Sequence, residues 1–348
     1  MSEAVDISGV DLAALTAWMD EQGLGAGPLS AVERLSGGTQ NVLMRFVRAE
    51  RQYVLRRPPP HLRANSNETN RREARILAAL AGTDVPHPGL IADCADETVL
   101  GAAFYLMEPV DGFNASSGLP KLHANDPSLR HRMGLAMVEG IAALSQVDYR
   151  ALGLGDFGNV ENWLGRQVGR WAAQLKSYDG TPNWPGPGAI PGVERVARWL
   201  EDNLPANFQP GIIHGDFHLA NVMFRHGDGE LAAIVDWELC TLGDPLLDLG
   251  WLVATWPETG QPLDKDKAIQ PWDGFATAEE LVAHYARRTR RDVSQFDWYF
   301  VLACYKLGII LEGSNARACA GKAPREIGDR LHAQTVRLFE RALRRINS

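Results

Sequence analysis

The segment from His214 to Asn221 gathers polar side chains directly after a short apolar stretch, and a second carboxylate, Asp236, ends the apolar run 232–235. Strands fix the positions of the side chains at their ends, so such groups can converge on one cleft. Asp216 is a carboxylate that can orient a hydroxyl group and accept its proton. Asn221 and Asp236 offer an amide and a carboxylate oxygen, which together with phosphate oxygens make the hard oxygen shell that Mg²⁺ favours. Phosphoryl transfer needs mainly positioning and charge neutralisation, and this pattern supplies both.

The same segment allows a second interpretation. His214, Asp216 and His218 alternate along the chain, which is a spacing used by ligands in zinc or iron hydrolases. No further histidine follows at ligand spacing, and this interpretation leaves Asn221 and Asp236 without a role. We therefore favour the phosphoryl-transfer interpretation, in which His214 braces the loop by hydrogen bonds.

Short apolar segments frame these residues. Three strands are expected at 211–214, 222–224 and 232–236, and the His-Gly-Asp-Gly run at 226–229 predicts a hairpin turn between the last two. A turn after Gly243 is followed by an expected helix near Pro245, which Asp244 is placed to cap. The sequence thus places the polar residues on the loops of a small hairpin.

The first third of the chain has a different pattern, in which short alternating strands and turns dominate. We expect a helix, a group of strands around a Gly-rich turn, a second helix and two further strands, at 11–23, 31–57, 68–81, 88–94 and 102–108. A break follows at 107–112, and helical patterns dominate from about residue 125 onward. The predicted fold class is α+β, with a small antiparallel-sheet lobe over 1–108 and a larger, mainly helical lobe over 109–348.

Composition limits the classes of function. The 348 residues carry a formal net charge of −8, which argues against a general nucleic-acid binder or a polybasic membrane-surface protein. No apolar stretch approaches the length of a membrane span, and the acidic start lacks a basic-then-apolar leader. The four cysteines are scattered, without a Cys-x-x-Cys pair. A cytoplasmic protein without membrane or nucleic-acid partners is the expectation.

Arginines are concentrated beside the Gly-rich turn. Between Arg45 and Arg75 there are nine arginines and three glutamates, a local charge of +6. A positive patch at such a turn suits a polyphosphate ligand, whereas a solvated arginine face is the alternative.

The pattern His-Gly-Asp-x-x-x-x-Asn at 214–221, followed by Ile-Val-Asp-Trp-Glu at 234–238, resembles the catalytic loop and metal-binding aspartate of the aminoglycoside phosphotransferase and choline kinase-like family. This family has the two-lobed protein-kinase-like fold. The resemblance covers most of the chain, and it is greatest to the phosphotransferase domains fused to certain acyl-CoA dehydrogenases. Further matching segments are Ser36–Asn41, Tyr53–Arg56, Arg72–Ala74, Tyr105–Glu108 and Gly243–Gly250.

The resemblance implies a small-molecule kinase that uses ATP and Mg²⁺. It implies that Asp216 is the catalytic base, that Asn221 assists it, and that Asn221 and Asp236 hold Mg²⁺. It also implies that His214 and Asp248 support the loop. The implied nucleotide-binding residues are Arg56 with its ion-pair partner Glu73, Met107 and Glu108 at the adenine edge, and the turn Ser36, Gly37, Gly38, Thr39, Gln40 and Asn41 over the phosphates.

Two residues depart from the family's pattern. Arg56 stands where the third strand usually carries lysine, and the adjacent Arg57 leaves the register open by one residue, which would change the face of the sheet. The metal-binding aspartate is followed by Trp237 and Glu238, and the role of Glu238 is left open. Because Arg56 replaces the usual lysine, a catalytically silent nucleotide-binding module is the alternative function.

The acceptor of the phosphoryl group is expected to lie against residues 155–210. This region holds four tryptophans, and Trp163 and Trp171 fall on one helical face. These rings either line an acceptor pocket or pack within the lobe. Arg166 and Arg170 favour an apolar or anionic hydroxylated acceptor over a polycation, and the resemblance favours a hydroxyacyl compound. ATP versus GTP and the oligomeric state are left open.

Overall fold

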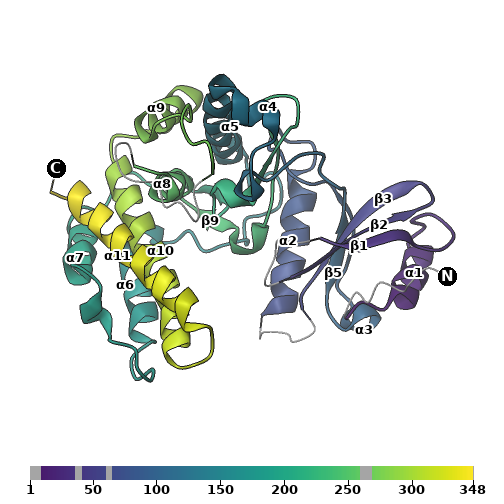
Figure 1. The fold of residues 1–348 in the computed structure, drawn as a ribbon, viewed down its shortest axis with the longest axis horizontal. Helices are drawn as coiled ribbons and strands as arrows, with labels where there is room; N and C mark the ends of the chain where they lie inside the picture. Colours follow the sequence, from purple (N-terminus) through teal and green to yellow (C-terminus); the bar gives the residue numbers. More distant parts are fainter. Residues whose placement is uncertain (1–8, 36–40, 60–64, 259–268, 348) are drawn as a thin grey trace.

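The computed structural model describes residues 9–35, 41–59, 65–258 and 269–347. An antiparallel sheet forms the first part of the chain and helices dominate the rest (Figure 1). This arrangement confirms the predicted α+β class and the two-lobed kinase-like fold.

A five-stranded antiparallel sheet is the centre of the first part, with the strand order β1-β2-β3-β5-β4. Alternating apolar residues explain it, because Val42, Met44 and Phe46 of one strand all point to a buried face. The strands are β1 Ser30–Arg34, β2 Val42–Arg48, β3 Arg51–Arg57, β4 Leu90–Cys94 and β5 Phe104–Met107. All lie within the segments that the sequence predicted as strands or beside them.

Helices cover both faces of this sheet. On one face, α1 (Leu12–Glu21) and the short α3 (Glu97–Leu100) pack with Leu55 and Leu106. On the other face, α2 (Ser66–Leu80) lies between the sheet and the helical part (Figure 1). Buried residues of α2 share one hydrophobic cluster with the helical part, so this helix connects the two lobes.

The arginines between Arg45 and Arg75 combine exposed side chains, such as Arg45, Arg51 and Arg75, with the buried Arg48, Arg56 and Arg57. Those in the described residues each contact a different partner, as Arg72 and Arg75 of α2 show. Arg72 donates to the Phe157 carbonyl at 2.7 Å, and Arg75 pairs with Asp156 at 2.6 Å. These arginines therefore hold segments together, and they tie α2 to the helical part.

The helical part surrounds two small pairs of strands. Its helices are α4 Lys121–Asn125, α5 Pro127–Gln146, α6 Trp163–Lys176, α7 Val193–Asp202, α8 Leu246–Thr255, α9 Ala278–Arg288, α10 Phe296–Cys319 and α11 Arg325–Arg345. The long α10 and α11 run side by side (Figure 1). Across the part of the chain that the structure describes, no helix is long and apolar enough to span a membrane.

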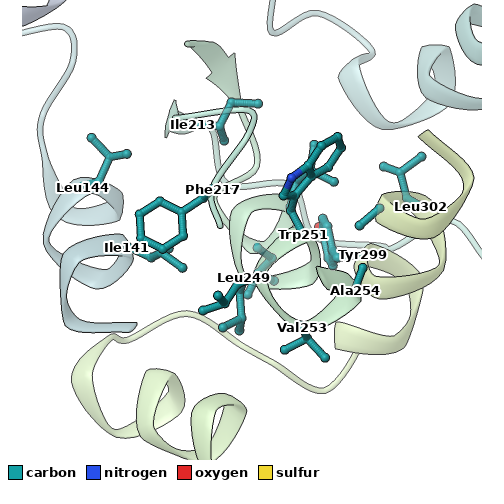
Figure 2. Packing of buried hydrophobic residues seen from close by; sticks show 14 of the residues in the cluster. Ile141, Leu144, Ile213, Phe217, Leu249, Trp251, Val253, Ala254, Tyr299 and Leu302 are labelled. Carbon is teal, nitrogen blue, oxygen red and sulfur yellow. The ribbon is translucent and has the colours of Figure 1, made fainter. Parts of the chain in front are cut away.

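The strand pairs position the polar loop. The hairpin of β7 (Val222–Phe224) and β8 (Leu231–Ile234) confirms the predicted turn at 226–229. The pairing of β6 (Gly211–Ile213) with β9 (Thr241–Gly243) was not predicted, because β9 is only three residues long and shows no alternation. Beneath the loop, Phe217 is fully buried and points toward Ile141 and Leu144 of α5 (Figure 2).

Candidate active site

Asp216 and Asn221 lie at the two ends of the loop that leads from β6 to β7. The Asn221 amide Nδ2 donates to the Asp216 backbone carbonyl at 2.9 Å and to its carboxylate Oδ2 at 3.0 Å. The amide nitrogen is thus turned toward Asp216, and the amide oxygen is turned away from it. The structure brings together the two side chains that the sequence predicted to be catalytic.

His218 is a further neighbour of the Asp216 carboxylate. Its Nδ1 accepts the Ala220 N–H at 3.2 Å, so its Nε2 carries the proton and lies 3.3 Å from Asp216 Oδ1. Burial acts to raise the pKa of Asp216, but the hydrogen bond from His218 and the nearby Lys306 outweigh it and lower the pKa below its ordinary value. Asp216 is therefore ionised at neutral pH, the state in which a carboxylate can accept a proton.

Asp236 follows β8 in the left-handed conformation, with φ of 66°. This backbone geometry ends the strand and leaves the carboxylate 37% exposed, facing Arg56 of β3. The Arg56 Nη2 atom lies 2.6 Å from Asp236 Oδ1. A residue of the sheet and a residue of the hairpin, 180 positions apart, are joined here.

Arg56 is held on its other side by α2. Its Nε lies 2.7 Å from the carboxylate of Glu73, which also accepts the Tyr105 hydroxyl at 2.7 Å. Burial acts to lower the pKa of Arg56, but the nearby Glu73, Tyr105 and Asp236 outweigh it and raise the pKa above its ordinary value. The guanidinium therefore carries its charge in this site.

The strand register decides between Arg56 and Arg57. Arg56 pairs with Tyr105, whereas Leu55 pairs with Leu106, so these two pairs lie on opposite faces of the sheet. Arg56 shares its face with α2 and the site. Arg57 points to the other face, where its side chain contacts the Gly9 carbonyl.

Buried groups support the loop from below. Asp248 of α8 accepts the backbone N–H of His214 at 2.6 Å and that of Gly215 at 2.9 Å. The His214 ring accepts the Asp216 N–H at 3.4 Å through Nδ1 and donates to the Val235 carbonyl at 3.0 Å through Nε2. Both nitrogens of His214 are engaged with backbone, so its position does not suit the metal-hydrolase interpretation.

Asp244 and Glu238 stand on either side of β9. Asp244 accepts the Leu246 N–H at 3.1 Å, as expected for a cap of α8, and the Tyr299 hydroxyl at 2.8 Å. Burial and the neighbouring Asp236 raise the pKa of Glu238 to about 7. Glu238 is therefore an acidic group close to Asp236 and Asp216, and a cation bound nearby would lower its pKa.

The nucleotide-binding residues predicted at the Gly-rich turn cannot be placed. Ser36, Gly37, Gly38, Thr39 and Gln40 lie outside the described residues, and Asn41 directly precedes β2.

At the predicted hinge, Met107 ends β5 and pairs with Val54 and Leu90. The Glu108 backbone N–H donates to the Gly89 carbonyl at 2.8 Å, and its exposed carboxylate lies 3.2 Å from Arg51. The side chain of Glu108 is thus engaged at the sheet.

The predicted acceptor region contributes packing as well as polar groups. Trp163 and Trp171 are buried, and Trp163 stacks on Phe208 at 5.7 Å between ring centroids. Trp184 instead donates its indole N–H to Glu312 of α10 at 2.7 Å. The tryptophans of α6 are therefore part of the lobe's core.

Two residues of the site were missed from the sequence. Tyr105 fell in the segment matched to the family's hinge, but its hydroxyl contact with Glu73 was not predicted, because it stands in an apolar strand. Lys306 of α10 is 9% exposed and donates to the Gly215 carbonyl at 3.0 Å. It is the only charged residue between Asp297 and Glu312, which is a signal that could have found it.

The donor set fits Mg²⁺. Asn221 turns an amide oxygen away from Asp216, and Asp236 presents a partly exposed carboxylate, so the two side chains offer the hard oxygen ligands that Mg²⁺ prefers. Within the described residues, no group of three or more His, Cys, Asp and Glu side chains is arranged to hold a metal ion. The arrangement matches a cation that is held partly by phosphate oxygens.

Residues 31–289 match the model of the phosphotransferase enzyme family. Among curated relatives, the chain is 30% identical over 304 residues to acyl-CoA dehydrogenase family member 10 of Mus musculus. It is 29% identical over 321 residues to acyl-CoA dehydrogenase family member 11 of Rattus norvegicus. These alignments cover 85% and 89% of this chain but only 27% and 40% of the two relatives, so the chain corresponds to less than half of their length.

Solved structures show the same fold. A protein of Ralstonia eutropha JMP134, provisionally assigned as an aminoglycoside phosphotransferase, is 32% identical with a TM-score of 0.78, over 96% of this chain and 99% of its own. A mutant of aminoglycoside phosphotransferase APH(4)-Ia, in ternary complex with AMP-PNP and hygromycin B, shares the fold at 16% identity with a TM-score of 0.58, over 92% of this chain and 98% of its own. The resemblance predicted from the sequence is confirmed, and the chain belongs to the phosphotransferase enzyme family.

Proposed function

We propose that this phosphotransferase transfers the γ-phosphoryl group of ATP to a hydroxyl group of a small acceptor. The observation that carries the proposal is a pair of contacts on neighbouring segments, Asn221 with Asp216 at 3.0 Å and Arg56 with Asp236 at 2.6 Å. The Val235 N–H donates to the Asn221 carbonyl at 2.9 Å and holds the two segments together. Residues from the sheet and from the hairpin loop meet there, as a reaction between a nucleotide and a second substrate requires.

Asp216 orients the acceptor hydroxyl and accepts its proton. Its lowered pKa keeps it ionised, and its hydrogen bonds to Asn221 and His218 hold the carboxylate in one orientation. A base of low pKa suits this reaction. In a loose transition state the acceptor hydroxyl has to be positioned, but it need not be deprotonated early.

Asn221 and Asp236 hold Mg²⁺, and Arg56 contacts the nucleotide phosphates. Bound Mg²⁺ supplies charge neutralisation on the phosphate oxygens. Arg56 carries a fixed charge that Glu73 orients from below, and its planar guanidinium can fork onto two phosphate oxygens. The nucleotide phosphates must compete with Asp236 for the Arg56 guanidinium, because Arg56 and Asp236 already form an ion pair.

The acceptor is a hydroxylated compound without a large positive charge, and a hydroxyacyl compound is our proposal. The curated relatives that are named acyl-CoA dehydrogenase family members support it by name.

The test is ADP release with Mg²⁺ and a library of hydroxylated acceptors, on the wild type and on Asp216→Asn. We expect the Asn variant to lose about 10²–10⁴-fold in kcat while binding ATP with unchanged affinity. Asp292→Asn is the matched control, because this exposed aspartate bonds only Ser294 of its own turn in the described residues. ATP binding with equal, low turnover in the wild type and Asp216→Asn would identify a silent nucleotide-binding module instead.

A further inference from the structure

A buried ammonium group lies directly beneath the proposed catalytic base. Lys306 belongs to α10, 90 residues beyond Asp216, and its Nζ donates to the Gly215 carbonyl at 3.0 Å. Two indole rings flank the ammonium, with Nζ 4.5 Å from the ring centroid of Trp251 in α8 and 5.6 Å from that of Trp171 in α6. Three helices thus build a closed seat for one positive charge.

Both backbone polar groups of Gly215 are hydrogen-bonded to buried side chains. Gly215 donates its N–H to the buried carboxylate of Asp248 at 2.9 Å, and its carbonyl accepts from Lys306. Its φ is +86°, and a Cβ atom at this position would lie 2.4 Å from the Leu239 carbonyl oxygen. An anion and a cation from two helices therefore hold the one residue that precedes Asp216.

Burying this charge is costly, so the site has to compensate for it. An apolar side chain of similar length would pack between the two indoles without losing the hydration of an ammonium group. The charged groups that face Lys306 are Asp248 from α8, Asp216 from the loop and Arg170 from α6. The negative charges of Asp248 and Asp216 outnumber the positive charge of Arg170, so the local electrostatic potential favours a cation at Lys306. Asp216 is one of the two sources of this potential.

We propose that Lys306 is a positioning residue for phosphoryl transfer, which fixes the Asp216 carboxylate through the Gly215 carbonyl and balances its charge. The inference rests on the proposed function, in which Asp216 is the base. Lys306 reaches the reaction only through the loop, since its hydrogen bond goes to backbone and its side chain is almost fully covered. Its loss should therefore lower kcat and leave the affinity for ATP unchanged.

Burial lowers the pKa of Lys306 to about 8, although Asp248 and Asp216 act to raise it. An ammonium that deprotonates near this pH can lose its hold on the loop within the range where kinases are assayed. The wild type should show a decline of kcat on the alkaline side, and a variant without the amine should lack that decline.

The test compares Lys306→Met with the wild type by kcat, by KM for ATP, by the pH profile of kcat, and by hydrogen exchange of the backbone over 214–221. We expect kcat to fall about 10- to 100-fold, as for loss of a charge-assisted hydrogen bond. We expect KM for ATP within about threefold of the wild type, no alkaline decline, and faster exchange in the loop.

Thr335→Val is the matched control. Thr335 is buried on α11 and donates to the Gly308 carbonyl of α10 at 3.0 Å, two residues from Lys306 in sequence. This variant removes a hydrogen bond from the same helix without touching the loop, so it should lower Tm and leave loop exchange and the pH profile unchanged.

A Lys306→Met protein with wild-type kcat, alkaline decline and loop exchange overturns the inference. If the Met variant does not fold, Lys306→Gln takes its place with the same expected direction. If Asp216→Asn proves as active as the wild type, the proposed function fails, and loop exchange still decides whether Lys306 holds the loop.

Discussion

Replacing Glu73 by glutamine tests the link between the sheet and the catalytic loop. Glu73 is 1% exposed, accepts from Arg56 Nη2 at 3.1 Å and from the Tyr105 hydroxyl at 2.7 Å, and has a carboxylate oxygen 2.7 Å from Arg56 Nε. Glutamine keeps the shape and one acceptor oxygen but removes the negative charge. The Arg56 guanidinium then remains buried with Asp236 as its nearest carboxylate partner.

The expected loss of stability follows from the burial of this pair. Breaking a buried ion pair costs about 3–5 kcal/mol. The retained oxygen and Asp236 compensate in part, so we expect about 2–3 kcal/mol for Glu73→Gln. With an unfolding entropy of about 2.1 cal/mol/K per residue, the whole chain gives about 0.7 kcal/mol/K, and Tm should fall by about 3–4 °C.

Activity should fall together with stability. Without Glu73, Arg56 is oriented by Asp236 alone, so its contact with that carboxylate competes more strongly with phosphate. We expect KM for ATP to rise and kcat/KM to fall by at least about tenfold. Scanning calorimetry and steady-state kinetics of ADP release measure the two effects.

A matched control comes from the same helix. Arg71 of α2 pairs with Glu97 at 2.6 Å, but these side chains are 37% and 47% exposed. Glu97→Gln should therefore cost less than about 1 kcal/mol and leave kcat/KM unchanged. If Glu73→Gln keeps Tm within 1 °C and kcat/KM within about twofold of the wild type, the reasoning about this buried pair is refuted.

Three further predictions concern groups around the loop. Gly215→Ala should destabilise the fold by at least about 2 kcal/mol and abolish turnover, because its Cβ would meet the Leu239 carbonyl at 2.4 Å; normal Tm would contradict this. Glu312→Ala should raise KM for the acceptor more than KM for ATP, because Trp184 loses its indole partner; equal changes in both constants would speak against an acceptor site beside that loop. In the folded protein the pKa of Lys306 is lowered from 10.5 to about 8, so between these pH values the unfolded chain binds more protons than the folded one. The wild type should therefore gain stability relative to Lys306→Met as the pH rises from 8 to 10. Thermal unfolding of both proteins at each pH measures this difference.

Much of the fold followed from periodicity. Strand β2 alternates because one face of the sheet is buried against α1, and the spacing of apolar residues in α2 reflects its contact with both lobes. The site residues Asp216, Asn221 and Asp236 were found because their types and their positions after apolar segments indicate one chemistry. Local pattern is sufficient where the group and its support lie on adjacent strands.

Other features depend on contacts that no local pattern contains. The pairing of β6 with β9 joins two segments of three residues, which are too short to show a period. The arginines near the Gly-rich turn looked like one patch, yet their partners lie as far along the chain as Asp156 and Asp236. Which of Arg56 and Arg57 faces the site depends on the strand register, and the pairing of β3 with β5 sets that register.

The charges of the site explain why a divalent cation belongs to the proposal. Five carboxylates gather around the loop, and the cations facing them in the described residues, Arg56, Lys306 and Arg170, are fewer, while burial lowers the pKa of His214 and keeps it neutral. A nucleotide would add further negative charge to this surplus. Burial and, after it, the neighbouring Asp236 raise the pKa of Glu238, and a divalent cation near Asp236 would offset the second effect together with the surplus of negative charge. The carboxylates are Glu73, Asp216, Asp236, Glu238 and Asp248. We therefore expect nucleotide affinity to fall when divalent cations are chelated, as a consequence of the same groups that hold the loop.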